Sequence, residues 1–181
     1  TILNCYVANS SVMTYASANG QGGAICGSDQ GGKVLNCFSR NNTITEKNNR
    51  GQIGGVCGYS KGIIENCYTV DTTLNTTNTS AKSVCGGTSA TMSNCFYLDT
   101  GTADQKATAR TKEWFMSDEA ITALGSKYFA KASNGENGGY PVLTFASLSA
   151  DKTKLKAELD KVPTSGYYTE DDRYNGVDTS K

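Results

Sequence analysis

The sequence predicts a mainly β fold, a short β-solenoid similar to a right-handed β-helix, and three observations support this prediction. All seven cysteines of the 181-residue chain fall in one pattern that repeats about every thirty residues. Each repeat has two short β-rich pieces with glycines between them, and no helical period of 3.6 residues. A repeat of this length indicates coils stacked about 4.8 Å apart. We expect about three and a half ~30-residue coils.

The repeat contains two cysteine elements. Cysteines of the Asn-Cys-aromatic element recur at spacings of 32, 30 and 28 residues, and those of the Cys-Gly element at 31 and 28. Stacking would place equivalent residues in columns, so we predict two cysteine ladders and an asparagine ladder with amide hydrogen bonds along the stack. The predicted ladder residues are Cys5, Cys37, Cys67 and Cys95; Cys26, Cys57 and Cys85; and Asn4, Asn36, Asn66 and Asn94.

An apolar residue stands three positions before each Asn-Cys cysteine, as Ile64 stands before Cys67. Regular strand alternation would place these two side chains on opposite faces. Both can point inward only if the chain bends between them. Asparagine tolerates the left-handed conformation that such a bend needs, so we predict that Asn66 and its equivalents are corner residues.

We expect the cysteines to be free thiols of the core. Disulfides between neighbouring coils are the alternative that the sequence leaves open, although the odd count would leave at least one thiol unpaired. A zinc site is disfavoured because the chain has no histidine and no Cys-x-x-Cys. We therefore predict no metal and no cofactor.

The composition changes after the last repeat, and we predict three regions. Residues 1–98 are the repeats, 99–147 a C-terminal cap of short helices and a terminal strand, and 148–181 a helical tail. A solenoid exposes an apolar end, and we expect the cap to cover it. Thr111 and Ser117 are suitable helix N-caps in this region.

The candidate binding residues are aromatic. Trp114, the only tryptophan, could form a sugar-stacking surface with Tyr128 and Tyr140, and packing inside the cap is the alternative. In the tail, the run from Asp171 to Asp178 is weakly similar to a calcium loop, but Arg173 occupies a ligand position.

Composition and charge disfavour several classes of function. Formal net charge is zero, which argues against nucleic-acid binding, and no apolar run approaches the ~20 residues that span a bilayer. Acid–base catalysis on polysaccharides would need clustered carboxylates. We expect no such cluster and no catalytic residues, because the candidate acids fall at different phases of the repeat: Asp29, Glu65, Asp71 and Asp99.

The repeat resembles a known family. The sequence Gly54-Gly55-Val56-Cys57-Gly58, followed by Ile64-Glu65-Asn66-Cys67-Tyr68, resembles the GLUG-type repeats of large bacterial surface proteins. The run Asn137-Gly138-Gly139-Tyr140-Pro141-Val142-Leu143 looks like the segment that commonly ends such arrays. This resemblance covers residues 1 to about 147 and carries no catalytic residue.

The tail resembles a second family. Leu155-Lys156-Ala157-Glu158-Leu159 and Tyr168-Thr169-Glu170-Asp171 are similar to the first part of a FIVAR module, a helical domain of secreted proteins, here cut short. The two resemblances imply part of a long exported protein, secreted or attached to the cell wall. They imply a non-catalytic structural or adhesive module, with a glycan or host surface protein as partner. The alternative is a glycan-binding accessory module of a secreted hydrolase or peptidase.

Overall fold

A computed structural model describes residues 1–15, 20–48, 50–77, 79–99 and 102–144. The chain divides into two compact units, Thr1–Thr144 and Phe145–Lys181, and all described residues belong to the first. The predicted helical tail, its FIVAR resemblance and its weak calcium-loop pattern lie outside the described residues. Among the helices that are described, none has the length and apolar character that crossing a membrane requires.

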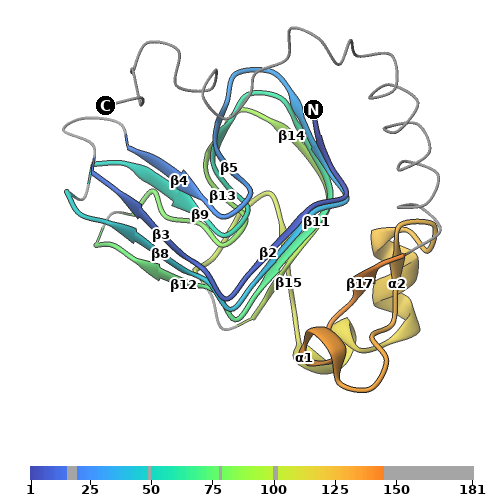
Figure 1. Cartoon of the computed structure of the whole chain (residues 1–181). Helices are drawn as coiled ribbons and strands as arrows, with labels where there is room; N and C mark the ends of the chain where they lie inside the picture. The colour runs from blue at the N-terminus through green and yellow to red at the C-terminus, as the bar shows by residue number, and fades with distance from the viewer. Residues whose placement is uncertain (16–19, 49, 78, 100–101, 145–181) are drawn as a thin grey trace, which may run out of the picture. The chain divides into compact units, whose positions relative to one another are not determined.

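The repeats form parallel sheets, and each repeat contributes strands to them in the same order (Figure 1). The largest sheet contains β1 (Ile2–Leu3), β2 (Tyr6–Ala8), β6 (Lys33–Leu35), β7 (Phe38–Arg40), β11 (Ile63–Val70), β14 (Thr91–Leu98) and β15 (Thr108–Arg110). The smaller parallel sheets are β3 (Ser11–Thr14), β8 (Thr43–Glu46) and β12 (Thr73–Asn75); β4 (Gln21–Gly23) and β9 (Gln52–Gly54); and β5 (Cys26–Asp29), β10 (Cys57–Ser60) and β13 (Cys85–Thr88).

Equivalent residues of successive repeats pair in register. Cys57 of β10 is the partner of Cys26 in β5 and of Cys85 in β13. Cys67 of β11 is likewise the partner of Cys95 in β14. The strands of successive repeats therefore lie one over the next, as Figure 1 shows. The structure is mainly β with parallel sheets, as the sequence predicts.

The chain bends at the asparagine of each Asn-Cys element. Asn66 has a positive φ of 51°, which is the left-handed conformation that asparagine adopts more readily than most residues. Because of this bend, Ile64 and Cys67 are both fully buried and belong to one core cluster. The same conformation recurs in the equivalent residues: Asn4 (φ 52°), Asn36 (φ 53°) and Asn94 (φ 48°).

The side chains of these asparagines form a hydrogen-bonded column. The amide of Asn36 donates to Asn4 Oδ1, that of Asn66 to Asn36 Oδ1, and that of Asn94 to Asn66 Oδ1, each at 3.0 Å. Each amide thus donates to one neighbour and, in the two middle members, accepts from the other. The column connects all four copies of the element through side chains as well as through backbone pairing.

A second row of bends was not predicted. It stands five residues after the first, at Asn9, Asn41 and Asp71, with φ values of 54°, 50° and 52°. Asn41 donates to Asn9 Oδ1 at 2.7 Å.

The expectation that Asp71 and Asp99 fall at different phases of the repeat was wrong. Thr69 of β11 is the partner of Tyr97 in β14, and Asp71 and Asp99 each stand two residues after these partners, so they occupy the same phase.

The core of the stack lies between the sheets and is rich in cysteine. Buried thiols pack there against the β-branched residues that the repeat places beside them. The buried residues of this cluster are Val34, Cys37, Val56, Cys57, Ile64, Cys67, Val84, Cys85, Ala90, Cys95 and Tyr97.

Asp104 terminates the Cys-Gly column, which is formed by Cys26, Cys57 and Cys85. Within the stack, the N–H groups of Val56 and Cys57 both donate to the carbonyl of Val84, at 3.0 Å. After the last repeat, the N–H groups of Val84 and Cys85 donate instead to Asp104 Oδ2, at 3.1 and 3.0 Å. The buried carboxylate of Asp104 thereby takes the place of the carbonyl of a further coil.

The segment after β15 contains the predicted helices. Thr111 and Ser117 cap them, since their hydroxyls accept from the N–H groups of Trp114 and Ala120. A short antiparallel hairpin follows instead of a single terminal strand. The elements are α1 (Lys112–Phe115), α2 (Asp118–Leu124), β16 (Phe129–Ala130), η1 (Glu136–Gly139) and β17 (Val142–Leu143).

This segment packs along the side of the stack, not over its end as expected. The aromatic residues that follow the cysteines in three successive repeats lie outside the cysteine core and pack against residues of the helices and the hairpin. Figure 1 shows these helices and the hairpin beside the largest sheet. The reason is the bend at asparagine, which turns the cysteine inward and the next side chain outward. This second cluster contains Phe38, Tyr68, Val70, Phe96, Phe115, Leu124, Phe129 and Tyr140.

Candidate functional site

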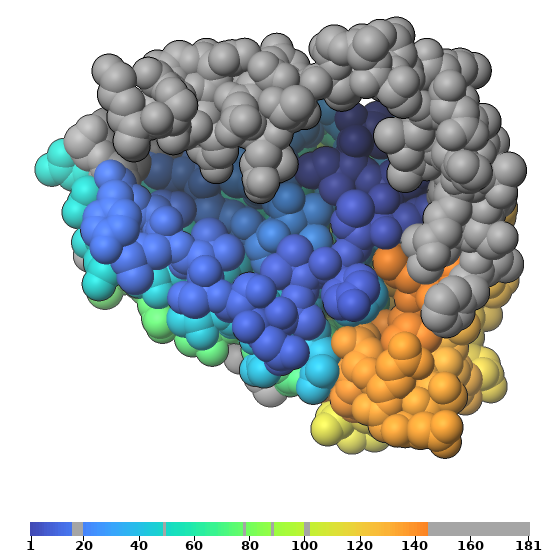
Figure 2. All heavy atoms as spheres, viewed as in Figure 1, coloured from blue at the N-terminus to red at the C-terminus, as the bar shows by residue number. Residues whose placement is uncertain are grey.

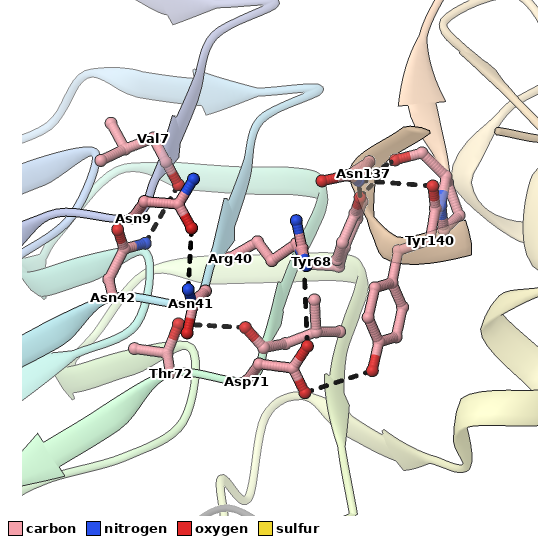
Figure 3. Close-up of polar contacts among 12 residues, drawn as sticks. Val7, Asn9, Arg40, Asn41, Asn42, Tyr68, Asp71, Thr72, Asn137 and Tyr140 are labelled. Carbon is pink, nitrogen blue, oxygen red and sulfur yellow. Dashed lines mark hydrogen bonds and ion pairs between the residues drawn. The ribbon is translucent and has the colours of Figure 1, made fainter. Parts of the chain in front are cut away.

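A polar cluster joins the repeats to the segment that follows them. We call it the latch, and its residues are Arg40, Tyr68 and Asp71 of the repeats with Asn137 and Tyr140 of the C-terminal segment (Figure 3). The three repeat residues come from the second and third copies. The two others belong to the Asn-Gly-Gly-Tyr-Pro sequence at residues 137–141.

Asn137 is the centre of one half of the latch. Its amide donates to the hydroxyl of Tyr68 at 2.9 Å and to the carbonyl of Pro141 at 2.8 Å. The Tyr68 hydroxyl itself donates to the carbonyl of Pro141. Asn137 reaches this place because it adopts a left-handed conformation, with φ 48°, at the tight turn of η1.

Asp71 is the centre of the other half. The hydroxyl of Tyr140 donates to Asp71 Oδ1 at 3.2 Å, and Arg40 Nε lies 3.9 Å from Asp71 Oδ2. The guanidinium of Arg40 also lies against Gly138, where an added Cβ would come within 2.7 Å of Nη2. Gly138 has a φ of 65°, so its conformation favours glycine, and an added Cβ would displace the end of the Arg40 side chain.

The two tyrosines of the latch stay protonated. Burial raises the pKa of the Tyr68 hydroxyl well above its usual value. Burial, together with the neighbouring carboxylate of Asp71, raises the pKa of Tyr140 to about 12. Both hydroxyls therefore remain hydrogen-bond donors at neutral pH. The two tyrosine hydroxyls and the Asn137 amide are paired within the latch, and these hydrogen bonds can hold the hairpin against the repeats.

The three predicted binding aromatics lie in one cluster, where they pack against the protein. Tyr140 is only 2% exposed, so its ring offers no face to a sugar. Trp114 is partly buried and packs against Phe96, with ring centroids 4.8 Å apart, and against the guanidinium of Arg110, 4.9 Å from the Trp114 ring. Tyr128 is also partly buried against the same cluster. These contacts are those of packing within the protein, which was the alternative to a sugar-stacking surface.

Exposed aromatic side chains lie instead on β2 and directly after β3. Tyr6 is 62% exposed and Tyr15 73% exposed. The ring of Tyr6 stacks on Phe38 at 5.0 Å and 7°, and Phe38 stacks on Tyr68 at 4.9 Å and 3°. Tyr6 therefore ends an aromatic column. Figure 2 shows the blue atoms of the N-terminal strands at the surface of this face.

None of the seven cysteines, all of which lie in the described residues, forms a disulfide, and their exposure follows their place in the stack. Cys5 is exposed and Cys26 partly buried, whereas the five others are buried. Among the described residues, no three side chains of the metal-binding types lie close enough to hold an ion. The free thiols agree with the expectation for the cysteine columns.

Comparison with known proteins adds no relationship: no family model, no curated protein and no solved structure matches the chain.

Sequence reasoning missed Asp104 and the contacts that form the latch. Asp104 lies outside every repeat, and only the position of the last coil makes its carboxylate an acceptor for two N–H groups. The second row of bends had a visible signal, an Asn or Asp five residues after each Asn of the first row. Asn137 belongs to the Asn-Gly-Gly-Tyr-Pro sequence, but its contact with Tyr68 depends on side-chain packing.

Proposed function

We propose that this chain is a β-solenoid repeat module of a long exported bacterial protein. Its function is to space or present other domains and to contact a host or glycan surface. The observation that supports this proposal is the register of the repeats: Cys57 has the equivalent cysteines of both neighbouring coils as its strand partners. Coils that pair in this way form a continuous stack, which is a stiff element of defined length.

The contacts within the stack are suited to a spacer. Asparagine amides, aromatic rings and backbone ladders all run along one direction, from coil to coil. Each coil interacts mainly with its neighbours, so coils can be added without changing the contacts of the others. The resemblance to GLUG-type repeats supports export and attachment to a cell surface, and residues 137–143 resemble the end of such an array.

Lengthening the stack tests this proposal. Three tandem copies of residues 36–65, inserted before Asn66, should give a folded chain whose longest dimension grows by about 14 Å in small-angle X-ray scattering. A ninety-residue Gly-Ser insertion at the same point is the control, because it adds the same chain length as coil. A chain that unfolds, or that gains no defined length, would contradict the β-solenoid proposal.

The contact with a surface is tested separately, by binding of the full chain to a glycan array and to host cells. A second candidate function, a glycan-binding accessory module, is favoured by the exposed rings of Tyr6 and Tyr15. The variants Tyr6→Ala and Tyr15→Ala should then lose binding, whereas Tyr59→Ala, a partly buried tyrosine of β10, should retain it. Equal binding by all three variants would contradict a tyrosine-based glycan site.

A further inference from the structure

In both cysteine columns solvent reaches one thiol, Cys5 in one column and Cys26 in the other, and the remaining thiols are buried. In the Cys-Gly column, Cys26 is partly buried, whereas Cys57 and Cys85 are 0% and 1% exposed. An accessible thiol therefore lies directly beside an inaccessible one. This juxtaposition is the arrangement of a reactive cysteine and a cysteine that can resolve its oxidised form.

The backbone places Cys26 and Cys57 within the range for a disulfide. The two residues are direct partners in the parallel strands β5 and β10. Neighbouring strands are about 4.8 Å apart, and disulfides form across Cα separations of about 4.4–6.8 Å. The N–H groups of Ile25 and Cys26 both donate to the carbonyl of Val56, which fixes the approach of the two strands next to the thiols.

The side chains of this pair interact directly. The hydrogen bond from the Cys57 thiol lowers the pKa of Cys26 to about 7, against the opposing effect of burial. The same hydrogen bond and burial raise the pKa of Cys57. Near neutral pH the proton therefore stays on Cys57, and Cys26 is the nucleophilic thiolate.

The neighbouring cysteine pairs differ in where the thiol of lowered pKa lies. In the other column it is Cys37, whose pKa is lowered chiefly by its hydrogen bond with Cys67, and Cys37 is fully buried. In the other column, the thiols of Cys5 and Cys37 donate to the carbonyls of Leu3 and Leu35, at 3.2 and 3.1 Å. Burial raises the pKa of Cys5, so this exposed thiol carries little thiolate. Cys85, the other partner of Cys57, is buried and out of reach of an oxidant in solution.

We propose that Cys26 and Cys57 form a disulfide between the first two repeats when the protein meets a peroxide. The Cys26 thiolate attacks the peroxide, the O–O bond breaks, and with one proton taken up the products are a sulfenic acid and water. Cys57 then attacks the Cys26 sulfur as its proton passes to the departing hydroxyl group, so that the S–S bond forms, the S–O bond breaks and a second water leaves. Two thiols are oxidised, and one hydrogen peroxide is reduced to two waters. The link would hold the first coil covalently to the second.

The test uses the full chain, reduced, freed of reductant and treated with hydrogen peroxide. After denaturation without reductant, a thiol reagent should find five of the seven thiols, and the mass should fall by about 2 Da. Trypsin places Cys26 in residues 1–33, Cys57 in 51–61 and Cys37 in 34–40. A Cys26–Cys57 link therefore joins 1–33 to 51–61. Cys5 shares the first peptide, so the mapping is repeated in Cys5→Ser.

Variants separate this pair from the others. Cys26→Ser should keep all six of its thiols after peroxide, and Cys85→Ser, in the same column, should fall from six to four. Far-UV circular dichroism before oxidation checks that each variant is folded. Seven thiols remaining in the wild-type chain, a link from 1–33 to 34–40, or a mass gain of about 32 Da on Cys26 from sulfinic acid would each overturn the proposal.

Discussion

The two ends of the stack carry the same repeat elements in opposite surroundings. At the N-terminal edge, Cys5 is exposed and the ring of Tyr6 is 62% exposed. At the other end, Cys95 and Phe96 occupy equivalent positions and are 3% and 7% exposed. The difference comes from neighbours, since β15 and the helical segment cover the last copy. A repeat position is therefore core or surface according to the coil beside it, not according to its residue type.

The largest expected difference in stability between the two ends lies in the aromatic column. Tyr68→Ala removes a fully buried ring and should lower the free energy of unfolding by about 3–5 kcal/mol. Tyr6→Ala removes the equivalent ring at the exposed edge and should cost only about 0.5–1 kcal/mol. Urea unfolding of both variants measures the difference. Equal losses would show that the edge position is as buried in solution as the interior one.

The second-largest loss of stability is expected at Asp104, whose carboxylate terminates the stack. Asp104→Ala leaves the buried N–H groups of Val84 and Cys85 without their acceptor and should cost about 2–4 kcal/mol in unfolding free energy. Asp104→Asn retains an oxygen acceptor and should lose less. Asp99→Ala, an exposed carboxylate nearby, is the control, with about 0.5 kcal/mol or less. If Asp104→Ala unfolds at the same urea concentration as the control, Asp104 does not terminate the stack.

The third-largest loss of stability is expected at the asparagine bends. Asn66→Ala places a residue in the left-handed region and breaks the amide contacts with Asn36 and Asn94, which should cost about 2 kcal/mol. Asn66→Gly breaks the same contacts but adopts the conformation freely, so it should lose about half as much. Thermal unfolding of the two variants separates conformation from hydrogen bonding. A glycine variant as unstable as the alanine variant would assign the whole effect to the amide column.

A carboxylate between interior coils gives the smallest effect, and it depends on pH. Burial raises the pKa of Glu46, but the N–H group of Gly51, the hydroxyl of Thr76 and the N–H group of Arg50 lower it more, so the net shift is downward. The stabilisation is present above about pH 4.5, the value expected for the unfolded chain, and is lost as pH falls through the lower folded value.

Glu46→Gln should therefore unfold more easily than the wild-type chain at pH 6, by about 1–2 kcal/mol, and this difference should shrink below pH 4.5. Urea midpoints measured from pH 6 to pH 3 provide the comparison. Glu119→Gln, at an exposed position of α2, is the control for removing a negative charge. A wild-type advantage that persists unchanged at pH 3 would exclude Glu46 as its source.

Several features of the fold could be predicted because they repeat along the chain. Ile64, Asn66 and Cys67 recur at fixed offsets, and a bend at asparagine was the only way to bury both apolar positions. The amide column followed from stacking these copies. The role of the aromatic residues could not be predicted, because the periodicity does not say which protein segment covers Phe38 and its equivalents.

The sequence by itself determined the repeat, its bends and the parallel pairing of its copies, because these depend on local conformation and on residues that recur at the same offset. Only the tertiary structure decided where the stack stops and what lies against its side. Those outcomes depend on single contacts between distant parts of the chain: Asp104 with Cys85, Asn137 with Tyr68, and Tyr140 with Asp71. Such contacts occur once, so no periodicity in the sequence indicates them.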